Sequence, residues 1–299
     1  AAKKPLLSSA CPAVVRLLQT KFPDLLAHVA PVLSPMEVAA RLAKEEAVAR
    51  TGVAYEEIGA FFISPCAAKV TEMRNPTNTR RSAVNGVIGA NLFYKDIIKH
   101  LNHRNIEPRE RPLQRATNLG MAWGYVTGES RNVDAPTTLA VGGIQNVISL
   151  LEEIELGELK EVDFIELQAC LGGCVGGPLN IQNVFVGRVR LRDLVKKYGT
   201  KEPYFDAIAL QKVLRQGHFE ATDPILPRRV LTLDEDVAQA LMKIERIEKI
   251  TEGLPGLDCG ACGSPSCRAL AEDIVRGIAF ETDCVINICT APAKGKHQA

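Results

Sequence analysis

Apolar and polar positions follow two different periods along the first three quarters of the chain. Short, nearly continuous apolar runs such as VDFIEL are followed by segments in which apolar residues recur with helical spacing. Runs of this kind are typical of strands covered on both faces, and the segments after them are typical of amphipathic helices. The predicted strands are 58–64, 86–90, 138–143 and 162–167, and the predicted helices are 38–50, 91–101 and 144–155. The repeated strand-to-helix order predicts an α/β fold with parallel strands.

The remainder of the chain has a different organisation. A proline-punctuated stretch, ATDPILPRR, is followed by a helical pattern over 234–253 and then by a compact cysteine-rich segment. We therefore expect four parts. These are a large α/β domain at 1–225, a linker and helix at 226–253, a small cysteine-rich domain at 254–289 and a polar tail at 290–299.

Charge and hydropathy exclude several functional classes. The 299 residues contain 36 Lys plus Arg and 35 Asp plus Glu, which gives a net charge of +1. This balance argues against a nucleic-acid-binding or membrane-surface protein. No apolar run approaches the ~20 residues of a membrane span, and AAKKPLLSS lacks the apolar core of a secretory signal. We expect a cytoplasmic protein whose nine cysteines are reduced.

The first set of cysteines consists of Cys11, Cys66, Cys170 and Cys174. The last two flank a glycine pair in ACLGGCVGG, directly after the predicted strand 162–167. Cys66 and Cys170 both follow the carboxyl ends of predicted strands, where open α/β sheets place their sites. Soft thiolate ligands favour an iron–sulfur cluster, and the glycines leave room for inorganic sulfide.

The second set lies near the end of the chain. Cys259, Cys262 and Cys267 have the spacing C-x2-C-x4-C, and Cys284 follows a predicted helix. Thiolates at this spacing can bind an iron–sulfur cluster or a zinc ion, although a zinc ribbon more often has two paired C-x2-C motifs. Cys289 falls outside the pattern and is interpreted as a core thiol.

The segment LPGLDCGACGSPSCRALAEDIVRG resembles a four-iron cluster domain found in electron-transfer subunits and in the gamma subunit of a corrinoid iron–sulfur protein. The resemblance implies a small helical domain with one [4Fe–4S] cluster. Its ligands would be Cys259, Cys262, Cys267 and Cys284.

The three upstream cysteine motifs, SSACP, SPCAAKVTE and QACLGGCVGG, resemble in order and spacing those of [FeFe]-hydrogenase catalytic domains. The resemblance implies parallel or mixed sheets flanked by helices, with a cluster between lobes. It also implies a second [4Fe–4S] cluster on the first set of cysteines. Cys174 would bridge this cluster to a di-iron unit with CO and cyanide ligands, Lys69 would donate to a cyanide, and Glu72 would pair with an arginine.

Four positions depart from the family pattern. Ala10 stands where active members have a proton-relay cysteine, and Ala30 stands where they have a relay serine. Ser64 and Gln168 replace two methionines of the di-iron pocket. Because proton relay needs a titratable group at each step, we expect weak or no H2 turnover. This pattern resembles the sensory subgroup of the family, which implies H2 binding read out as a redox state.

Family members carry further sequence before the SSACP motif. We therefore expect the N-terminal part of the family domain to be missing from residues 1–225 and the di-iron pocket to need that lobe. Expected partners are H2 or protons and a ferredoxin-type redox domain. Two alternatives stay open: an electron-transfer protein with two [4Fe–4S] clusters and no di-iron unit, and a docking scaffold for a regulatory kinase or phosphatase.

Overall fold

The fold is taken from a computed structural model, which describes residues 3–101, 116–199, 206–228, 233–234, 236–257, 262, 264, 266–284 and 286–287. The chain forms two compact units that divide after Arg228. Each unit is described by itself.

A three-stranded parallel sheet forms the centre of the first unit. The strand order is β1 (Leu6–Leu7), β5 (Phe164–Gln168) and β4 (Thr138–Gly142), with β5 in the middle. Phe164 is aligned with Leu6 on one side and with Thr138 on the other. Every residue of β5 is buried, as its continuous apolar run predicts.

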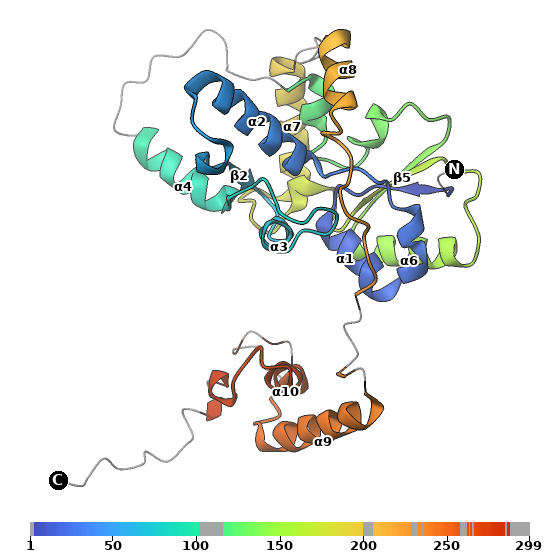
Figure 1. Cartoon of the computed structure of the whole chain (residues 1–299), viewed down its shortest axis with the longest axis vertical. Coiled ribbons are helices and arrows are strands. Elements are labelled where there is room, and N and C mark those ends of the chain that lie inside the picture. Colours follow the sequence, from blue (N-terminus) through green and yellow to red (C-terminus); the bar gives the residue numbers. More distant parts are fainter. Residues whose placement is uncertain are drawn as a thin grey trace, which may run out of the picture. The chain divides into compact units, whose positions relative to one another are not determined.

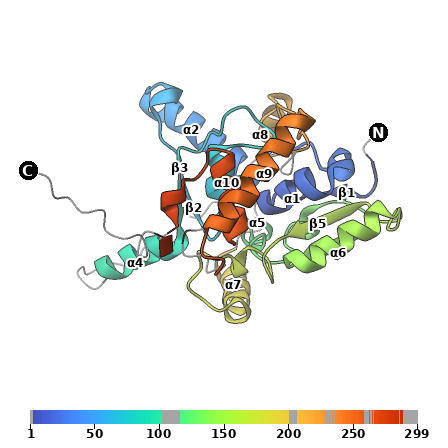
Figure 2. The same cartoon turned by 90° about the horizontal axis from the view of Figure 1, so that it is seen from below.

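Two helices cover one face of this sheet. α1 (Pro12–Lys21) and α6 (Ile144–Glu155) lie together below it in Figure 1, and the view from below shows them flanking β5 (Figure 2). Their apolar stripes meet the sheet in a core of fully or nearly fully buried residues: Leu7, Val14, Leu18, Val147, Leu151, Ile165 and Leu167. This core fixes the positions of the loops that leave the carboxyl ends of the strands.

A second, two-stranded parallel sheet pairs β2 (Phe61–Ser64) with β3 (Gly86–Gly89). The expectation that this apolar strand is covered on both faces is wrong. Phe62 and Ser64 face the core around Met36, whereas the side chains of Phe61 and Ile63 are 67% and 44% exposed. Residues two apart share a face of a strand, so one whole face of β2 lies open among the residues that the structure describes.

The helix predicted over 38–50 is present and is longer than predicted at both ends. Ser34 caps α2 (Pro35–Thr51), accepting a hydrogen bond from the Glu37 amide at 3.5 Å, and Gly52 ends the helix with a φ of 72°. The other helical segments of the first unit are η1 (Pro23–His28), η2 (Tyr55–Glu57), α3 (Ala68–Arg74), α4 (Ala90–Leu101), α5 (Asn118–Ala122), η3 (Ser130–Asn132), η4 (Cys174–Gly176), α7 (Val184–Tyr198) and α8 (Ala207–Arg215).

The second unit is helical in its described part. α9 (Val237–Gly253) packs against α10 (Cys267–Val275), and a short turn, η5 (Glu281–Asp283), follows. Ile247, Leu270 and Ala271 are the centre of its core. The helix predicted over 234–253 begins at Val237 because Asp236 caps it. Among the described helices of either unit, none has the length and apolar character of a membrane span.

Candidate functional site

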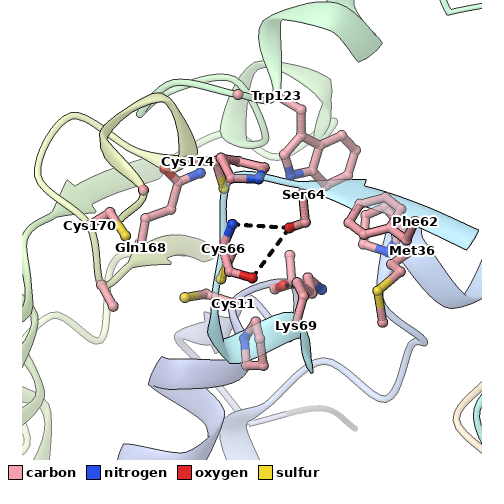
Figure 3. Close-up of a pocket in the computed structure, with 17 residues that line it drawn as sticks. Cys11, Met36, Phe62, Ser64, Cys66, Lys69, Trp123, Gln168, Cys170 and Cys174 are labelled. Carbon is pink, nitrogen blue, oxygen red and sulfur yellow. Dashed lines mark hydrogen bonds between the residues drawn. The ribbon is translucent and has the colours of Figure 1, made fainter. Parts of the chain in front are cut away.

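Loops that follow three strands bring the first set of cysteines together. Cys11 follows β1 and precedes α1, Cys170 follows β5, and Cys66 follows β2. β1 and β5 are parallel, so their carboxyl ends lie at the same edge of the sheet. Figure 3 shows Cys11, Cys66, Cys170 and Cys174 around one pocket, as their positions after parallel strands predict.

This cysteine pocket has a volume of about 210 Å³. Its walls carry four thiols, one ammonium group and a largely apolar surround. Its lining residues include Ala10, Cys11, Ser64, Cys66, Lys69, Gln168, Cys170 and Cys174. The pocket is far larger than one metal ion requires, since even a bound water fills only about 30 Å³.

The loop between Cys170 and Cys174 needs its glycines for close backbone contact. Gly172 and Gly173 have φ angles of 74° and 98°, which strain any residue with a Cβ. A Cβ on Gly173 would also lie 2.3 Å from Oε1 of Gln168 and 2.7 Å from the amide nitrogen of Val126. The glycine pair thus seats the loop against the segment before β4 and aims Cys174 into the pocket.

Burial and neighbouring thiols favour the protonated form of Cys170 and Cys174 in the absence of a bound cation. The pKa of Cys174 is raised to about 12 by burial, and then by the neighbouring Cys11 and Cys66, while Lys69 opposes the rise. Burial also raises the pKa of Cys170, again with Cys66 and Cys11 adding to the effect. A bound metal centre reverses this balance, because coordination deprotonates a thiol outright.

These donors fit a polynuclear cluster better than a single ion. Within the described part of the chain, no three Cys, His, Asp or Glu side chains form a group that could hold one metal ion. Four soft thiols around a pocket of this size instead suit an iron–sulfur cluster.

Ser64 fixes the turn that carries Cys66. Its hydroxyl accepts a hydrogen bond from the Cys66 amide at 3.1 Å and donates to the Cys66 carbonyl at 3.4 Å (Figure 3). Gln168 lies across the same pocket at the end of β5 and is 5% exposed. Its Oε1 has no hydrogen-bond partner within the described part of the chain.

Lys69, in the first turn of α3, is buried and lines the pocket. Its Nζ donates to the carbonyl of Ala10 at 3.2 Å, which holds the ammonium beside the Cys11 loop. Ala10 also lines this pocket.

Two other residues singled out in the sequence lie outside the pocket lining. Glu72 accepts hydrogen bonds from the amide and hydroxyl of Thr77, and its Oε2 lies 3.9 Å from Nη2 of Arg16. Ala30 is buried, and its amide donates to the carbonyl of Leu7 at 2.8 Å. Both residues therefore hold together segments behind the pocket.

A buried acid, Glu129, was missed by the sequence analysis. The Ser8 hydroxyl lies 2.8 Å and 2.7 Å from its two carboxylate oxygens. Burial raises the pKa of Glu129 to about 7, Glu166 adds to the rise, and the Ser8 hydrogen bond and Lys69 oppose it. The sequence Gly128-Glu129-Ser130 has the composition of a surface turn, so nothing in it signals a buried acid.

The second set of cysteines lies in the second unit. Cys284 is 6% exposed within the α9–α10 core, and Cys262 and Cys267 pack against that core. Ser266 caps α10, accepting from the Ala269 amide at 3.1 Å, so that Cys267 opens the helix. The predicted ligand Cys259 and the predicted core thiol Cys289 lie outside the described residues.

Comparison with known families decides the classification of the first unit. Residues 1–133 and 124–178 match the family model of the iron-only hydrogenase large subunit, C-terminal domain. The chain belongs to this family. Residues 254–286 match a separate iron–sulfur cluster family, FeS. The protein is therefore a hydrogenase-like iron–sulfur protein, which confirms both family resemblances at this level.

Two curated relatives cover different parts of the chain. The NADP-reducing hydrogenase subunit HndD of Solidesulfovibrio fructosivorans is 26% identical over an alignment of 220 residues that covers 58% of this chain and 37% of that protein. One component of the ion-translocating oxidoreductase complex of Rhodobacter capsulatus is 50% identical over 38 residues, or 13% of this chain and 20% of that one. The chain thus spans little more than a third of the hydrogenase relative.

Solved structures show the same fold. An [FeFe]-hydrogenase, HydA(deltaEFG), from a study of H-cluster assembly, has a TM-score of 0.56 and 18% identity, with 76% of this chain and 77% of that chain covered. A variant of HydA1 from Chlamydomonas reinhardtii has a TM-score of 0.56 and 16% identity, and the match again covers 76% of this chain and 77% of that chain. The predicted hydrogenase-like α/β fold, with parallel sheets flanked by helices, is confirmed.

Proposed function

We propose that this protein binds H2 at a di-iron unit linked to a [4Fe–4S] cluster, turns H2 over slowly and transmits its redox state as a sensor. The ligands of this cluster are Cys11, Cys66, Cys170 and Cys174. The observation that carries the proposal is the pocket itself, in which four thiols and one buried ammonium group surround a space large enough for a polynuclear centre.

Each residue of the pocket has a separate task. The thiolates would hold the cluster, and Cys174, whose backbone is fixed by the glycine pair, would also hold the di-iron unit. Lys69 is held by the Ala10 carbonyl at 3.2 Å and directs its remaining N–H groups at an anionic acceptor such as cyanide. When bound, the metal centre supplies the open coordination position for H2 and the store for electrons.

Ala10 makes this pocket unsuited to fast proton transfer. A methyl group on the pocket wall has no exchangeable proton, so a proton produced in the pocket lacks an acceptor there. A sensor tolerates this arrangement, because its output depends on occupancy and redox state. Electrons would be exchanged with a ferredoxin-type redox partner.

A second candidate function is electron transfer through two [4Fe–4S] clusters without a di-iron unit. The match of the cysteine segment to a component of an ion-translocating oxidoreductase complex favours it. In that case the pocket in the first unit would hold a cube alone.

Infrared spectroscopy separates the two functions. After anaerobic maturation with the di-iron unit, and with the preceding part of the family domain supplied in cis or in trans, we expect CO and cyanide stretching bands. We expect Lys69→Met to shift the cyanide bands because it removes the N–H donors. Lys99→Met, at an exposed site on α4, serves as the matched control and leaves them unchanged. A matured protein with cubes but without these bands would favour electron transfer instead.

The number of clusters is tested by iron content. Reconstituted protein is expected to bind about eight irons per chain, four for each cysteine set. Cys262→Ser and Cys66→Ser should each reduce this to about four and remove different EPR signals, because the two sets lie in separate compact units. Cys289→Ser is the control and should keep the full iron content. Stoichiometric zinc, or loss of both signals in either ligand variant, would contradict the assignment.

A further inference from the structure

Glu129 is a buried acid with a defined place behind the cysteine pocket. It is 8% exposed and faces Ser8, which is 1% exposed and lies in the loop between β1 and Cys11. The Ser8 oxygen also accepts a hydrogen bond from the Ala10 amide at 3.1 Å. The carboxyl group is thereby tied to the loop whose next residues, Ala10 and Cys11, form the pocket wall.

Glu166 holds the turn that presents Glu129. Its two oxygens accept hydrogen bonds from the backbone amides of Thr127, Glu129 and Ser130 at distances of 3.0, 3.1 and 2.8 Å. Both oxygens act only as acceptors, as in a carboxylate. The turn is therefore fixed by β5, the strand that leads to Cys170, and the position of Glu129 relative to the pocket is fixed with it.

Lys69 connects Glu129 to the metal ligands electrostatically. The same ammonium group acts on Glu129 and on the Cys174 thiol, in each case favouring the charged form of the acid. The charged groups that bear on Glu129 are Glu166 from β5, which disfavours its ionisation, and Lys69 from α3, which favours it. No cysteine is among the hydrogen-bond partners of Glu129 in the described part of the chain, so Glu129 is not in direct contact with a metal ligand.

We propose that Glu129 takes up a proton when the cluster in the cysteine pocket is reduced. One electron arrives from a low-potential one-electron donor such as a reduced ferredoxin or viologen, and one proton arrives from solvent. The added negative charge is stored on the cluster, and the Glu129 carboxylate becomes a neutral carboxylic acid. Reoxidation releases the same proton and the same electron.

Electrostatics supplies the coupling. Two unit charges about 10 Å apart at an effective dielectric constant of about 20 interact strongly enough to change a proton affinity by about tenfold. A carboxyl group that already titrates near neutrality crosses from mostly ionised to mostly protonated under such a change. Proton uptake here needs no side chain at position 10, so it suits a pocket in which Ala10 interrupts direct transfer.

The proposal rests on the cluster assignment in the proposed function. It is tested by EPR-monitored redox titrations of the reconstituted full chain between about pH 6 and pH 9, with dithionite and viologen mediators. We expect the reduction potential of the first-unit cluster to be constant below about pH 7 and to fall with rising pH above it. The second-unit cluster serves as an internal control with a different ligand set.

Four variants make the test specific. Glu129→Gln should abolish the fall in potential, whereas Glu153→Gln, an exposed acid on α6, should leave it unchanged. Ser8→Ala removes a hydrogen bond that lowers the pKa of Glu129, so the reduction potential should begin to fall at a higher pH than in the parent. Ser8→Thr keeps a hydroxyl at this position, so its reduction potential should depend on pH as that of the parent does. If Ser8 only packed against Glu129, its replacement would not change the pH at which the reduction potential begins to fall.

The outcomes that overturn the proposal are distinct from failure of the cluster assignment. A first-unit EPR signal whose potential is independent of pH, or whose pH dependence persists in Glu129→Gln, overturns proton uptake at Glu129 and leaves the cluster assignment standing. Absence of any first-unit EPR signal overturns both.

Discussion

Replacing Ala10 by cysteine is expected to raise H2 oxidation by about 10²–10⁴-fold in protein matured with the di-iron unit and supplied with the preceding part of the family domain. The residue lines the cysteine pocket, and its carbonyl fixes Lys69, so a thiol at this position would place an exchangeable proton on the wall beside the metal centre. The four cysteine ligands remain as they are. The measurement is dye-linked H2 oxidation, with iron content and infrared bands recorded on the same samples.

The matched control is Ala10→Ser. Serine has a similar size but a hydroxyl that does not ionise near neutral pH, so it should raise the rate much less than cysteine. Parent protein that already oxidises H2 at the rate of a metabolic hydrogenase would contradict the sensor proposal. An unchanged rate in Ala10→Cys would instead direct attention to Ser64 and Gln168, which also depart from the family pattern.

The cysteine pocket could be predicted from sequence because its geometry follows from strand direction. Cys11 and Cys170 follow parallel neighbouring strands, and Cys66 follows a third strand, so their loops converge without any knowledge of side-chain packing. The continuous apolar run of β5 likewise predicts its buried, central position.

Two features could not be predicted, for different physical reasons. The apolar run of β2 has the same signal as that of β5, yet Phe61 and Ile63 are exposed, because periodicity cannot tell which face of a strand will be covered. Glu129 is buried through contacts with residues far away in sequence, Ser8 and Glu166, and a local pattern carries no trace of such contacts.

The buried network also changes the interpretation of the first cysteine motif. Ser8 is the first residue of SSACP, and it lies against Glu129, while Lys69 of the second motif reaches the Ala10 carbonyl. The motifs therefore supply metal ligands, and they also join the buried acid Glu129 and the buried ammonium group of Lys69 to the same loop. Because a charge buried in low dielectric raises the cost of adding another of the same sign, such a loop links the charge of the pocket to protonation nearby.

Stability of the first unit is expected to fall as the pH rises from about 4.5 to about 7, with Glu129 as the cause. Its pKa is about 7 in the folded chain and 4.5 in the absence of burial, so between these values the folded state binds a proton that the unfolded state has released. Stability falls with pH wherever the folded state binds more protons, and the full difference corresponds to a loss on the order of 3 kcal/mol. Glu129→Gln cannot ionise, so its gain in stability over the parent should be much larger at about pH 8 than at about pH 5. The measurement is the midpoint of thermal unfolding under anaerobic, reducing conditions at both pH values, with Glu153→Gln as the exposed-acid control.

A stabilisation that is equal at the two pH values would show that glutamine improves packing, and would contradict ionisation of Glu129 as the source of the pH dependence.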